Sequence, residues 1–416
     1  MKYWRLLGIM LLVWLVGIVP CSAAKTKIVH LRPRNVGPQS TQWLEKIAEE
    51  YEALNPDIEV DIYYAGSTAE LIQQVLLQFA SGVAPDVVEI AAEDGYPLAT
   101  QNIFANLSPI IAGDKNIDIQ ELYPVAVQAA TMTEGANAGN FWFLPHVVNT
   151  SIMVLNDDMF HEAGIQPPSQ WNYQWTWDDF VDICKKLTIY DGDGQIIRYG
   201  ANVPNFYNRF PLWVHNAGGW YFDRLFNPRE SRLTTEPVHT ALSFLQDIYH
   251  THRVAHWLNG NILNNTAAIA LGLPTFKAGY DAAKCFFAYS FALNPKLVRG
   301  ANIVQVQGLA LTQNSPNAEA AYKWIKYVAL ERALEHQAAT GFISTWKKIS
   351  MRYPDKFWFS VLNDDQNIPR PVYDLDIRNE LQKYVNAITQ DQKPVAPTLQ
   401  QAHEVLNNLL KEKASR

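Results

Sequence analysis

The chain has 416 residues, a formal charge of −7 and only 18% charged residues. The acidic balance argues against nucleic acid or an anionic membrane surface as partner, and the length predicts two domains because it exceeds one compact core. Beyond residue 21 the only cysteines are Cys184 and Cys285, too few for a disulfide framework. Whether these two form a pair is left open by the sequence.

Residues 1–24 have the features of a signal peptide. Two basic residues precede an apolar run over residues 6–19, and small residues follow it up to Ala24. The run is shorter than the roughly 20 apolar residues of a membrane span. We therefore expect cleavage near Ala23 or Ala24 and an exported protein, with an uncleaved anchor as the alternative. Lipidation of Cys21 is a further alternative, although Pro20 stands where a lipoprotein signal normally has a small residue.

Strand and helix patterns alternate over residues 27–90. Short segments rich in β-branched residues at 27–31, 58–62 and 87–90 predict strands, and apolar residues spaced by three and four predict helices over 43–54 and 71–79. The order β-α-β-α-β indicates a parallel, layered α/β lobe.

Ligands of such lobes gather at the carboxyl ends of the strands. Arg34 and Asn35 follow the first predicted strand, and Glu93 and Asp94 follow the third. These four residues are the first candidates for ligand contacts. The alternative is that they are solvated loop residues.

The segment from Phe141 to Leu155 is predicted to be a strand buried on both faces. It is an almost uninterrupted apolar run that starts with clustered aromatics and contains Asn149. A polar side chain buried in a strand needs a partner. We expect this strand to pass between two lobes, with Trp142 near the cleft and Asn149 facing it.

The second half of the chain repeats the mixture of helix and strand patterns. Thr176 is placed to cap a helix that runs to about Leu187, and amphipathic patterns predict helices over 237–251 and 399–410. Residues 206–222 are rich in aromatics, and residues 307–312 are expected to form a strand.

No catalytic motif is present. The sequence lacks a nucleophile elbow, a phosphate-binding loop and a metalloprotease helix. The fragment Asp191–Gln195 lacks the final acid of a calcium loop, and His252 and His256 have no third ligand nearby. We therefore expect no enzyme activity, no metal and no cofactor. A secreted glycosidase or lyase remains the alternative, because catalytic carboxylate pairs can come from distant positions.

Several motifs together resemble a known family. In order along the chain they are residues 43–90, Trp142–Phe160, Gly164–Pro168, Trp175–Phe180, Asn216–Gly219 and Ser315–Trp324. Their order and spacing resemble the sugar-binding (maltodextrin-type, family 1) group of the extracellular solute-binding proteins of bacterial ABC importers. Asn149 departs from that group, where an acidic residue is common at this position.

The resemblance implies a two-lobe periplasmic-binding-protein fold (type II) of the α/β class. Each lobe would have a mainly parallel sheet flanked by helices, with the ligand cleft at the hinge. We expect residues 25–148 plus 288–337 in the N-terminal lobe and 149–287 plus 338–416 in the C-terminal lobe. Two further hinge crossings are expected near residues 285–290 and 337–343.

The resemblance also implies a carbohydrate ligand, closure of the lobes on it, and transmembrane permease subunits as partners of a monomer in the periplasm. Sugar rings stack on aromatics while their hydroxyls need hydrogen bonds. By position we expect ligand contacts from Arg34, Asn35, Glu93, Asp94, Trp142, Asn149, Asn205, Tyr207, Trp213, Asn216 and Phe276. A sensing or adhesion protein on the same scaffold is a further alternative.

Overall fold

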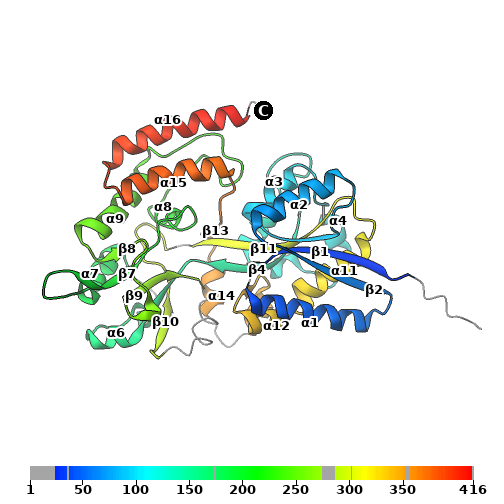
Figure 1. Cartoon of the computed structure of the whole chain (residues 1–416), viewed down its shortest axis with the longest axis horizontal. Coiled ribbons are helices and arrows are strands. Elements are labelled where there is room, and N and C mark those ends of the chain that lie inside the picture. The colour runs from blue at the N-terminus through cyan, green and yellow to red at the C-terminus, as the bar shows by residue number, and fades with distance from the viewer. Residues whose placement is uncertain are drawn as a thin grey trace, which may run out of the picture.

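The computed structural model describes residues 24–34, 37–171, 175–273, 286–300, 302–352 and 357–414. These residues form two α/β lobes that lie side by side (Figure 1). Each lobe has its own sheet and its own hydrophobic core. The two-lobe fold predicted from the sequence is therefore confirmed.

The first lobe is built on a seven-stranded sheet in the order β12-β4-β11-β3-β1-β2, with β13 also beside β11. The strands are β1 (Thr26–Pro33), β2 (Ile58–Ala65), β3 (Val87–Ala91), β4 (Leu144–Thr150), β11 (Ile303–Leu311), β12 (Ile343–Ser344) and β13 (Ile368–Pro369). The α-helices of this lobe are α1 (Pro38–Leu54), α2 (Thr68–Ala80), α3 (Ala92–Thr100), α4 (Ser108–Gly113), α5 (Pro124–Ala130), α11 (Ala318–Lys326), α12 (Ala333–Thr340), α13 (Lys347–Ser350) and α14 (Phe357–Leu362).

The second lobe has a six-stranded sheet in the order β10-β5-β9-β7-β6, with β8 beside β7. Its strands are β5 (Ile152–Asn156), β6 (Ile189–Tyr190), β7 (Ile196–Asn202), β8 (Ala255–His256), β9 (Ala267–Gly272) and β10 (Tyr289–Ala292). Its helices are α6 (Asp157–Glu162), α7 (Trp177–Leu187), α8 (Pro211–Asn216), α9 (Glu236–Gln246), α15 (Leu375–Thr389) and α16 (Val395–Ala414).

Local sequence signals set several of these elements. Thr176 caps α7 as predicted: its side chain accepts a hydrogen bond from Asp179 N, and the Asp179 carboxylate accepts one from Thr176 N in return. In α1, Trp43, Leu44 and Ile47 share one buried face against the sheet, as their spacing predicted.

Both sheets are mixed, which differs from the mainly parallel sheets expected. In the first lobe β1 pairs in parallel with β2 and β3, but β11 is antiparallel to β3 and β4. In the second lobe β7 is parallel to β8 and β9, while β5 is antiparallel to β9 and β10. The reason is that the chain crosses between the lobes in strands. These crossing strands pair with the strands of the βαβ units in the antiparallel direction.

The first crossing is the segment singled out in the sequence. β4 belongs to the first sheet and β5 to the second, and every residue of both strands is buried. The side chains of Ile152 and Val154 pack in the first core, whereas Met153 and Leu155 pack in the second. Successive side chains of a strand point to opposite faces, so β5 contributes side chains to the cores of both lobes.

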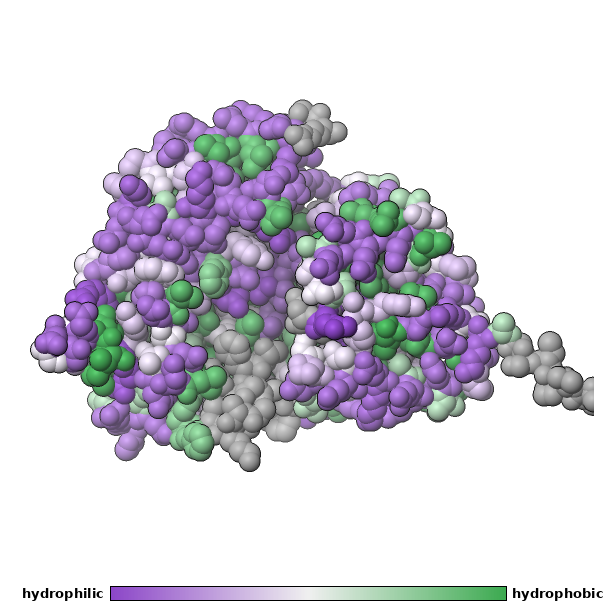
Figure 2. All heavy atoms as spheres, viewed as in Figure 1, coloured by the Kyte–Doolittle hydropathy of each residue, from purple (hydrophilic) through white to green (hydrophobic). Residues whose placement is uncertain are grey.

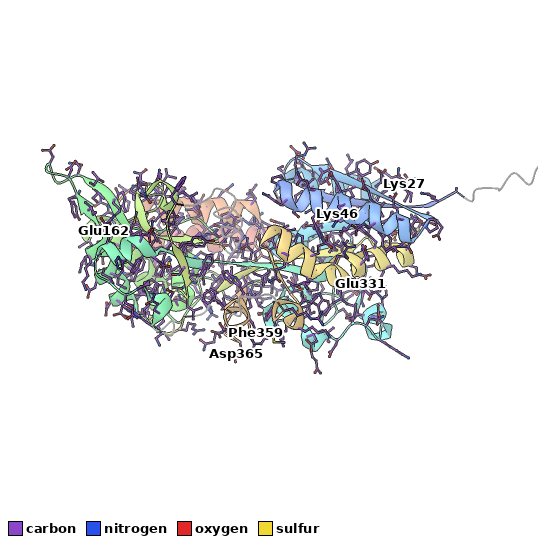
Figure 3. The ribbon with its side chains drawn as sticks, turned by 90° about the horizontal axis from the view of Figure 1, so that it is seen from below. Lys27, Lys46, Glu162, Glu331, Phe359 and Asp365 are labelled. Atoms are coloured by element: carbon purple, nitrogen blue, oxygen red, sulfur yellow. The ribbon has the colours of Figure 1, made fainter. Side chains whose placement is uncertain are left out.

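The other two crossings lie elsewhere than predicted. β10 pairs with β5 in the second sheet, and the chain returns to the first lobe at Ile303 and Val304. β12 pairs with β4 in the first sheet, and the last crossing follows β13, between Val372 and Tyr373. Pairing and packing therefore put residues 289–292 in the second lobe and residues 338–352 and 357–362 in the first, opposite to the expected boundaries. In Figure 3, Phe359 and Asp365 lie near the middle of the molecule, where the two lobes meet.

The surface of the face in Figure 2 is largely hydrophilic, with hydrophobic side chains in small separate groups, and it is hollowed between the two lobes. Within the ranges described, no helix is both long and apolar enough to cross a membrane. Cys184 is a buried free thiol, and Cys285 lies outside the described residues.

Candidate ligand-binding site

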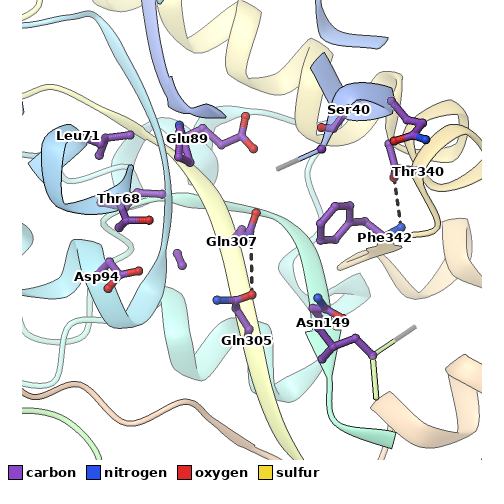
Figure 4. A pocket seen from close by; sticks show the side chains of 16 residues that line it. Ser40, Thr68, Leu71, Glu89, Asp94, Asn149, Gln305, Gln307, Thr340 and Phe342 are labelled. Carbon is purple, nitrogen blue, oxygen red and sulfur yellow. Dashed lines mark hydrogen bonds between the residues drawn. The ribbon is translucent and has the colours of Figure 1, made fainter. Parts of the chain in front are cut away.

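A cavity of about 430 Å³ opens where the parallel strands of the first sheet end. Pro33 at the end of β1 and Ala91 at the end of β3 line it, and α2 begins there at Thr68. Asn149 reaches it from β4, and Leu273, just after β9, reaches it from the second lobe. The cavity thus lies at the carboxyl ends of strands, as expected for an α/β lobe, and touches both lobes. Its described lining is Pro33, Gly37, Gln39, Ser40, Thr68, Leu71, Glu89, Ile90, Ala91, Asp94, Asn149, Leu273, Gln305, Gln307, Thr340 and Phe342 (Figure 4).

Three amide side chains converge on the cavity from the crossing strands. Gln305 pairs with Asn149 across the β11–β4 ladder, and Gln307 follows two positions later on the same face of β11. The Gln305 amide donates to Glu93 Oε1 at 2.6 Å, and Gln307 donates to Gln305 Oε1 at 3.4 Å (Figure 4). Asn149 is 6% exposed, and its Oδ1 has no hydrogen-bond partner. A buried acceptor without a partner is costly, so this oxygen contributes nothing to the stability of the strand.

Glu93 and Asp94 lie in the first turn of α3 and face arginines from further along the chain. Arg370 Nη1 donates to Glu93 Oε1 at 3.1 Å, and Arg378 of α15 donates to Asp94 Oδ1 at 3.4 Å. Burial raises the pKa of Asp94 to about 6 and the Glu93 carboxylate adds to this, while Arg378 opposes it. The Asp94–Arg378 ion pair joins the two lobes directly beside the cavity.

The floor of the cavity rests on a buried polar cluster in the first lobe. Glu89 forms an ion pair with Arg32 at 3.1 Å, and Arg32 also donates to Ser40 Oγ at 2.9 Å. Burial raises the pKa of Glu89 against the opposing effect of Arg32. Ser40 Oγ lies 3.3 Å from Nε2 of His336. The polar side chains beneath the cavity are therefore held in place by hydrogen bonds and an ion pair.

Three histidines, His30, His146 and His336, lie buried behind this floor. The rings of His146 and His336 are 4.6 Å apart, and neither ring nitrogen of His146 has a partner. Burial, helped by Arg32, lowers the pKa of His146 to about 3. All three rings are therefore neutral at pH 7, since burial also lowers the pKa of His30 and His336 well below the usual range.

This cluster makes the fold acid-sensitive. The unfolded chain protonates His146 near its ordinary pKa of 6.5, whereas the folded chain resists until about pH 3. The free energy of unfolding is therefore unaffected by this histidine above pH 6.5. Below pH 6.5 it decreases as the pH falls, by about 1.4 kcal/mol per pH unit for one proton. We expect His146→Leu to unfold with a shallower pH dependence between pH 6 and pH 4 in urea titrations. Parallel slopes for the variant and the parent would contradict this.

Phe342 supplies the aromatic face of the cavity. Its ring stacks on His336 with an interplanar angle of 8° and lies on the opposite side of the cavity from Asp94 and Thr68 in Figure 4. Aromatic faces pack against the C–H faces of sugars.

We expect Phe342→Ala to weaken binding of a cognate sugar about tenfold, because an aromatic contact contributes about 0.5–1.5 kcal/mol beyond buried area. Isothermal titration calorimetry measures this directly. Tyr190→Ala, which removes a 44% exposed ring on β6, is the control and should bind like the parent. Equal losses in both variants, or none in Phe342→Ala, would remove Phe342 from the site.

A second cavity of about 590 Å³ lies further out between the lobes, between α3 and the helices α15 and α16. Tyr96 and Tyr373 line it, and Arg378, which donates to both Asp94 and the Tyr373 carbonyl, separates it from the first cavity. It is larger, but no residue of the crossing strands β4 and β11 is among its described lining. The first cavity is therefore the better candidate.

The structure brings together only part of the predicted site. Asp94 and Asn149 line the cavity, and Glu93 is linked to it through Gln305. Arg34 is exposed, with its guanidinium 6.0 Å from the ring of Tyr64. Asn35 and Phe276 lie outside the described residues.

Four predicted residues are core residues instead. Trp142 is 2% exposed and donates to the Ala129 carbonyl at 3.2 Å, and Trp213 is fully buried among aromatics of the second lobe. Asn205 donates to Thr389 Oγ1 at 2.6 Å, and Asn216 donates to the Pro295 carbonyl at 3.4 Å. Trp142, Asn205 and Asn216 make hydrogen bonds inside the lobes, whereas Trp213 packs among aromatics with its indole N–H unpaired. The sequence does not distinguish such interior positions from a cleft position.

Tyr207, the remaining candidate of the second lobe, is partly buried. Its ring lies 5.3 Å from the Arg378 guanidinium. It therefore supports the arginine that pairs with Asp94 rather than lining the first cavity itself.

Several lining residues were not predicted. Gln305 and Gln307 alternate with valines in the segment Val304–Gln307, a pattern typical of a strand with one polar face. Phe342 lies in the segment 337–343, for which the sequence predicts a hinge crossing and no ligand contact. Its place in the cavity follows from the pairing of β12 with β4, which no local pattern reveals.

No group of three or more histidine, cysteine, aspartate or glutamate side chains in the described ranges is arranged to hold a metal ion. The fragment Asp191–Gln195 is a turn in which Asp191 Oδ1 accepts hydrogen bonds from the backbone of Asp193 and Gln195. Gly194 adopts a φ of 77° there, which favours glycine.

Solved structures with the same fold are numerous. An ABC substrate-binding protein from Listeria monocytogenes in complex with cycloalternan is 20% identical, with a TM-score of 0.76 over 93% of this chain and 99% of that chain. The sugar-binding protein MalE of Xanthomonas citri is 17% identical, with a TM-score of 0.77 over 94% and 98%. At these identities the likeness establishes the fold.

Sequence relatives match over shorter stretches. An uncharacterised lipoprotein of Streptomyces antibioticus is 28% identical over 167 residues, 40% of this chain and 34% of that protein. The sn-glycerol-3-phosphate-binding periplasmic protein UgpB of Salmonella typhimurium is 24% identical over 151 residues, 35% and 32% of the two chains. The chain thus matches about a third of the length of these relatives.

The sequence model described as "Bacterial extracellular solute-binding protein" matches residues 37–335, from the start of α1 to α12. This span contains both sheets except β1, β12 and β13, and most of the described residues that line the cavity. Because the match extends over more than half of the chain, this protein belongs to the family of bacterial extracellular solute-binding proteins.

Proposed function

We propose that the protein is the extracytoplasmic substrate-binding component of an ABC importer and captures a carbohydrate between its two lobes. The observation that carries the proposal is the cavity at the crossing strands, where Asn149, Gln305 and Gln307 converge beside an aromatic ring. Sugar hydroxyls need several hydrogen-bonding partners within a small volume, and amides supply both donors and acceptors. The sugar complexes among the similar structures support the same class of ligand.

Closure of the lobes converts binding into a signal. The cavity is lined mainly by the first lobe, while Leu273 of the second lobe closes one side of it. A ligand that contacts both lobes favours the closed arrangement and shifts the population towards it. The Asp94–Arg378 pair and the hydrogen bond from Asn227 to Glu134, at 2.5 Å, join the lobes in this arrangement.

The proposed setting follows from the family. The mature protein is a monomer in the periplasm, or at the outer face of the cytoplasmic membrane where Cys21 carries lipid, and transmembrane permease subunits receive the closed form. It binds its solute without chemical change. The two carboxylates in the described lining of the cavity are held by arginines, Glu89 by Arg32 and Asp94 by Arg378, which suits a binding role.

A thermal-shift screen tests the proposal. The mature chain is heated with neutral oligosaccharides, amino sugars, polyols, sugar phosphates and, as a contrasting class, amino acids and short peptides. We expect at least one carbohydrate to raise the melting temperature, because a ligand that binds only the folded state stabilises it. The compound should be recovered unaltered by mass spectrometry. Stabilisation only by amino acids or peptides would overturn the carbohydrate assignment, and cleavage of the sugar would favour a secreted enzyme.

A further inference from the structure

A group of arginines and carboxylates between the lobes has one arginine more than it has acids. Arg370, just after β13, donates to Glu93 at 3.1 Å, and Arg378 of α15 donates to Asp94 at 3.4 Å. Arg209, between β7 and α8, pairs with no carboxylate of the described residues, and its pKa is lowered to about 9 by burial and by the nearby charge of Arg370. The group therefore has one positive charge in excess when both carboxylates are ionised.

Two of these arginines also keep donors that no protein atom uses. Each nitrogen of the Arg378 guanidinium donates to a protein oxygen. In contrast, the side chain of Arg370 makes one hydrogen bond within the described ranges, from Nη1 to Glu93, and that of Arg209 makes one, from Nη1 to the Asn208 carbonyl at 3.2 Å. Nε and Nη2 of both side chains are not among the enclosed atoms that lack a partner, so a molecule from solution can reach them. This holds although Arg370 is only 8% exposed.

Such a pair of guanidinium groups is suited to an oxyanion. Water would satisfy the open N–H groups but would leave the repulsion between Arg209 and Arg370 in place. A carboxylate or phosphate oxygen would accept charge-assisted hydrogen bonds from both and offset the excess charge.

The two arginines lie next to the cavity described above. Glu93 Oε1 accepts hydrogen bonds both from Arg370 and, at 2.6 Å, from Gln305, whose side chain lines the cavity. Arg209 belongs to the second lobe, because its neighbour Phe210 packs in the second core, whereas Glu93 begins α3 of the first lobe. An anion held by Arg209 and Arg370 is therefore placed where the lobes meet.

We propose that Arg209 and Arg370 form an anion subsite beside the cavity, and that the saccharide captured by this protein carries a carboxylate or phosphate group. The inference rests on the proposed function and narrows its ligand class. It also assigns the anion a part in closure, since a group that contacts both lobes favours the closed arrangement.

Calorimetry with matched ligands tests the inference. The series are glucose with glucuronic acid and glucose 6-phosphate, galactose with galacturonic acid and galactose 1-phosphate, and glycerol with glycerol 3-phosphate. We expect a charged member of the best series to bind at least about tenfold more tightly than its neutral parent compound. Preference for the acid identifies a carboxylate ligand, and preference for the ester identifies a phosphate ligand.

Arg209→Met should reduce this preference by at least about tenfold, because it removes the arginine that has no acid of its own. It leaves the ion pairs of Arg370 and Arg378 in place, so the variant should fold. Arg198→Met is the control. It removes an arginine of β7 that pairs with Glu162 at 2.9 Å, and it should keep the preference.

Inorganic phosphate is a probe that needs no sugar. At equal ionic strength it should raise the melting temperature of the parent more than that of Arg209→Met. Arg209→Glu puts a carboxylate beside Arg370 and should reverse the preference towards the neutral compound, which keeps the test decisive where Arg209→Met does not fold.

Tighter binding of the neutral compound by the parent in every series would overturn the inference and leave carbohydrate import standing. A preference for the charged compound that folded Arg209→Met or Arg209→Glu retains would also overturn it, as would an equal effect of phosphate on the parent and Arg209→Met. Stabilisation by phosphate that depends on Arg209, without binding of any saccharide, would support the subsite and overturn the proposed function.

Discussion

Asn149→Leu should weaken sugar binding strongly while leaving the protein folded. Asn149 sits on the first crossing strand, lines the cavity and keeps one buried acceptor without a partner. Leucine has a similar volume but offers no polar group to a sugar hydroxyl, so the hydroxyl would be buried unpaired. That costs about 1–3 kcal/mol for each unpaired group. We expect binding to weaken by about two orders of magnitude in calorimetry.

Folding should change little in this variant, because the substitution removes a buried polar group that has no partner for its oxygen. We expect the free energy of unfolding to stay within about 1 kcal/mol of the parent. Two asparagines serve as controls. Asn363→Leu, at an exposed position, should affect neither binding nor stability, whereas Asn205→Leu should lose stability because it breaks the bond to Thr389. Undiminished sugar binding by Asn149→Leu would mean that this strand is only core.

Gly308→Ala should destabilise the first lobe strongly. Gly308 lies on β11 between β3 and β4, and an added Cβ would stand 1.6 Å from Phe143 Cδ2 and 2.7 Å from the Leu144 carbonyl oxygen. Phe143 is fully buried, so its ring has no free space to move into. Overpacking of this kind costs about 3 kcal/mol, at the upper end of its usual range. Urea unfolding of the mature chain measures the loss.

Gly113→Ala is the matched control, since a Cβ there meets nothing within 4 Å. It should be neutral. The double variant Gly308→Ala with Phe143→Leu should be more stable than the sum of the two single losses predicts, because the smaller side chain relieves the clash. Equal stability of Gly308→Ala and Gly113→Ala would show that the ladder between β3 and β4 relaxes at no cost. The register of β11 shifts between Gln307 and Gly308, so the packing at Gly308 also fixes the amides that face the cavity.

The sequence by itself determined the class of fold and the main crossing. The βαβαβ order over residues 27–90, the capping of α7 by Thr176 and the buried run Phe141–Leu155 depend on local periodicity, capping and composition, which act over a few residues. Asn149 stood out for the same reason, as a polar side chain within an apolar strand. Asp94 could be found because parallel strands end at a common edge.

Only the tertiary structure decided which residues face the cavity and where the chain returns between the lobes. Trp213 and Asn216 look like cleft residues in the sequence but pack inside the second lobe, while Phe342 reaches the cavity because β12 pairs with β4. The second and third crossings depend on pairings of β10 with β5 and of β13 with β11, between segments far apart in the chain. Whether an aromatic or amide side chain lies in a core or in a cleft depends on which residues pack against it. Those residues come from distant parts of the sequence, so local patterns do not predict them.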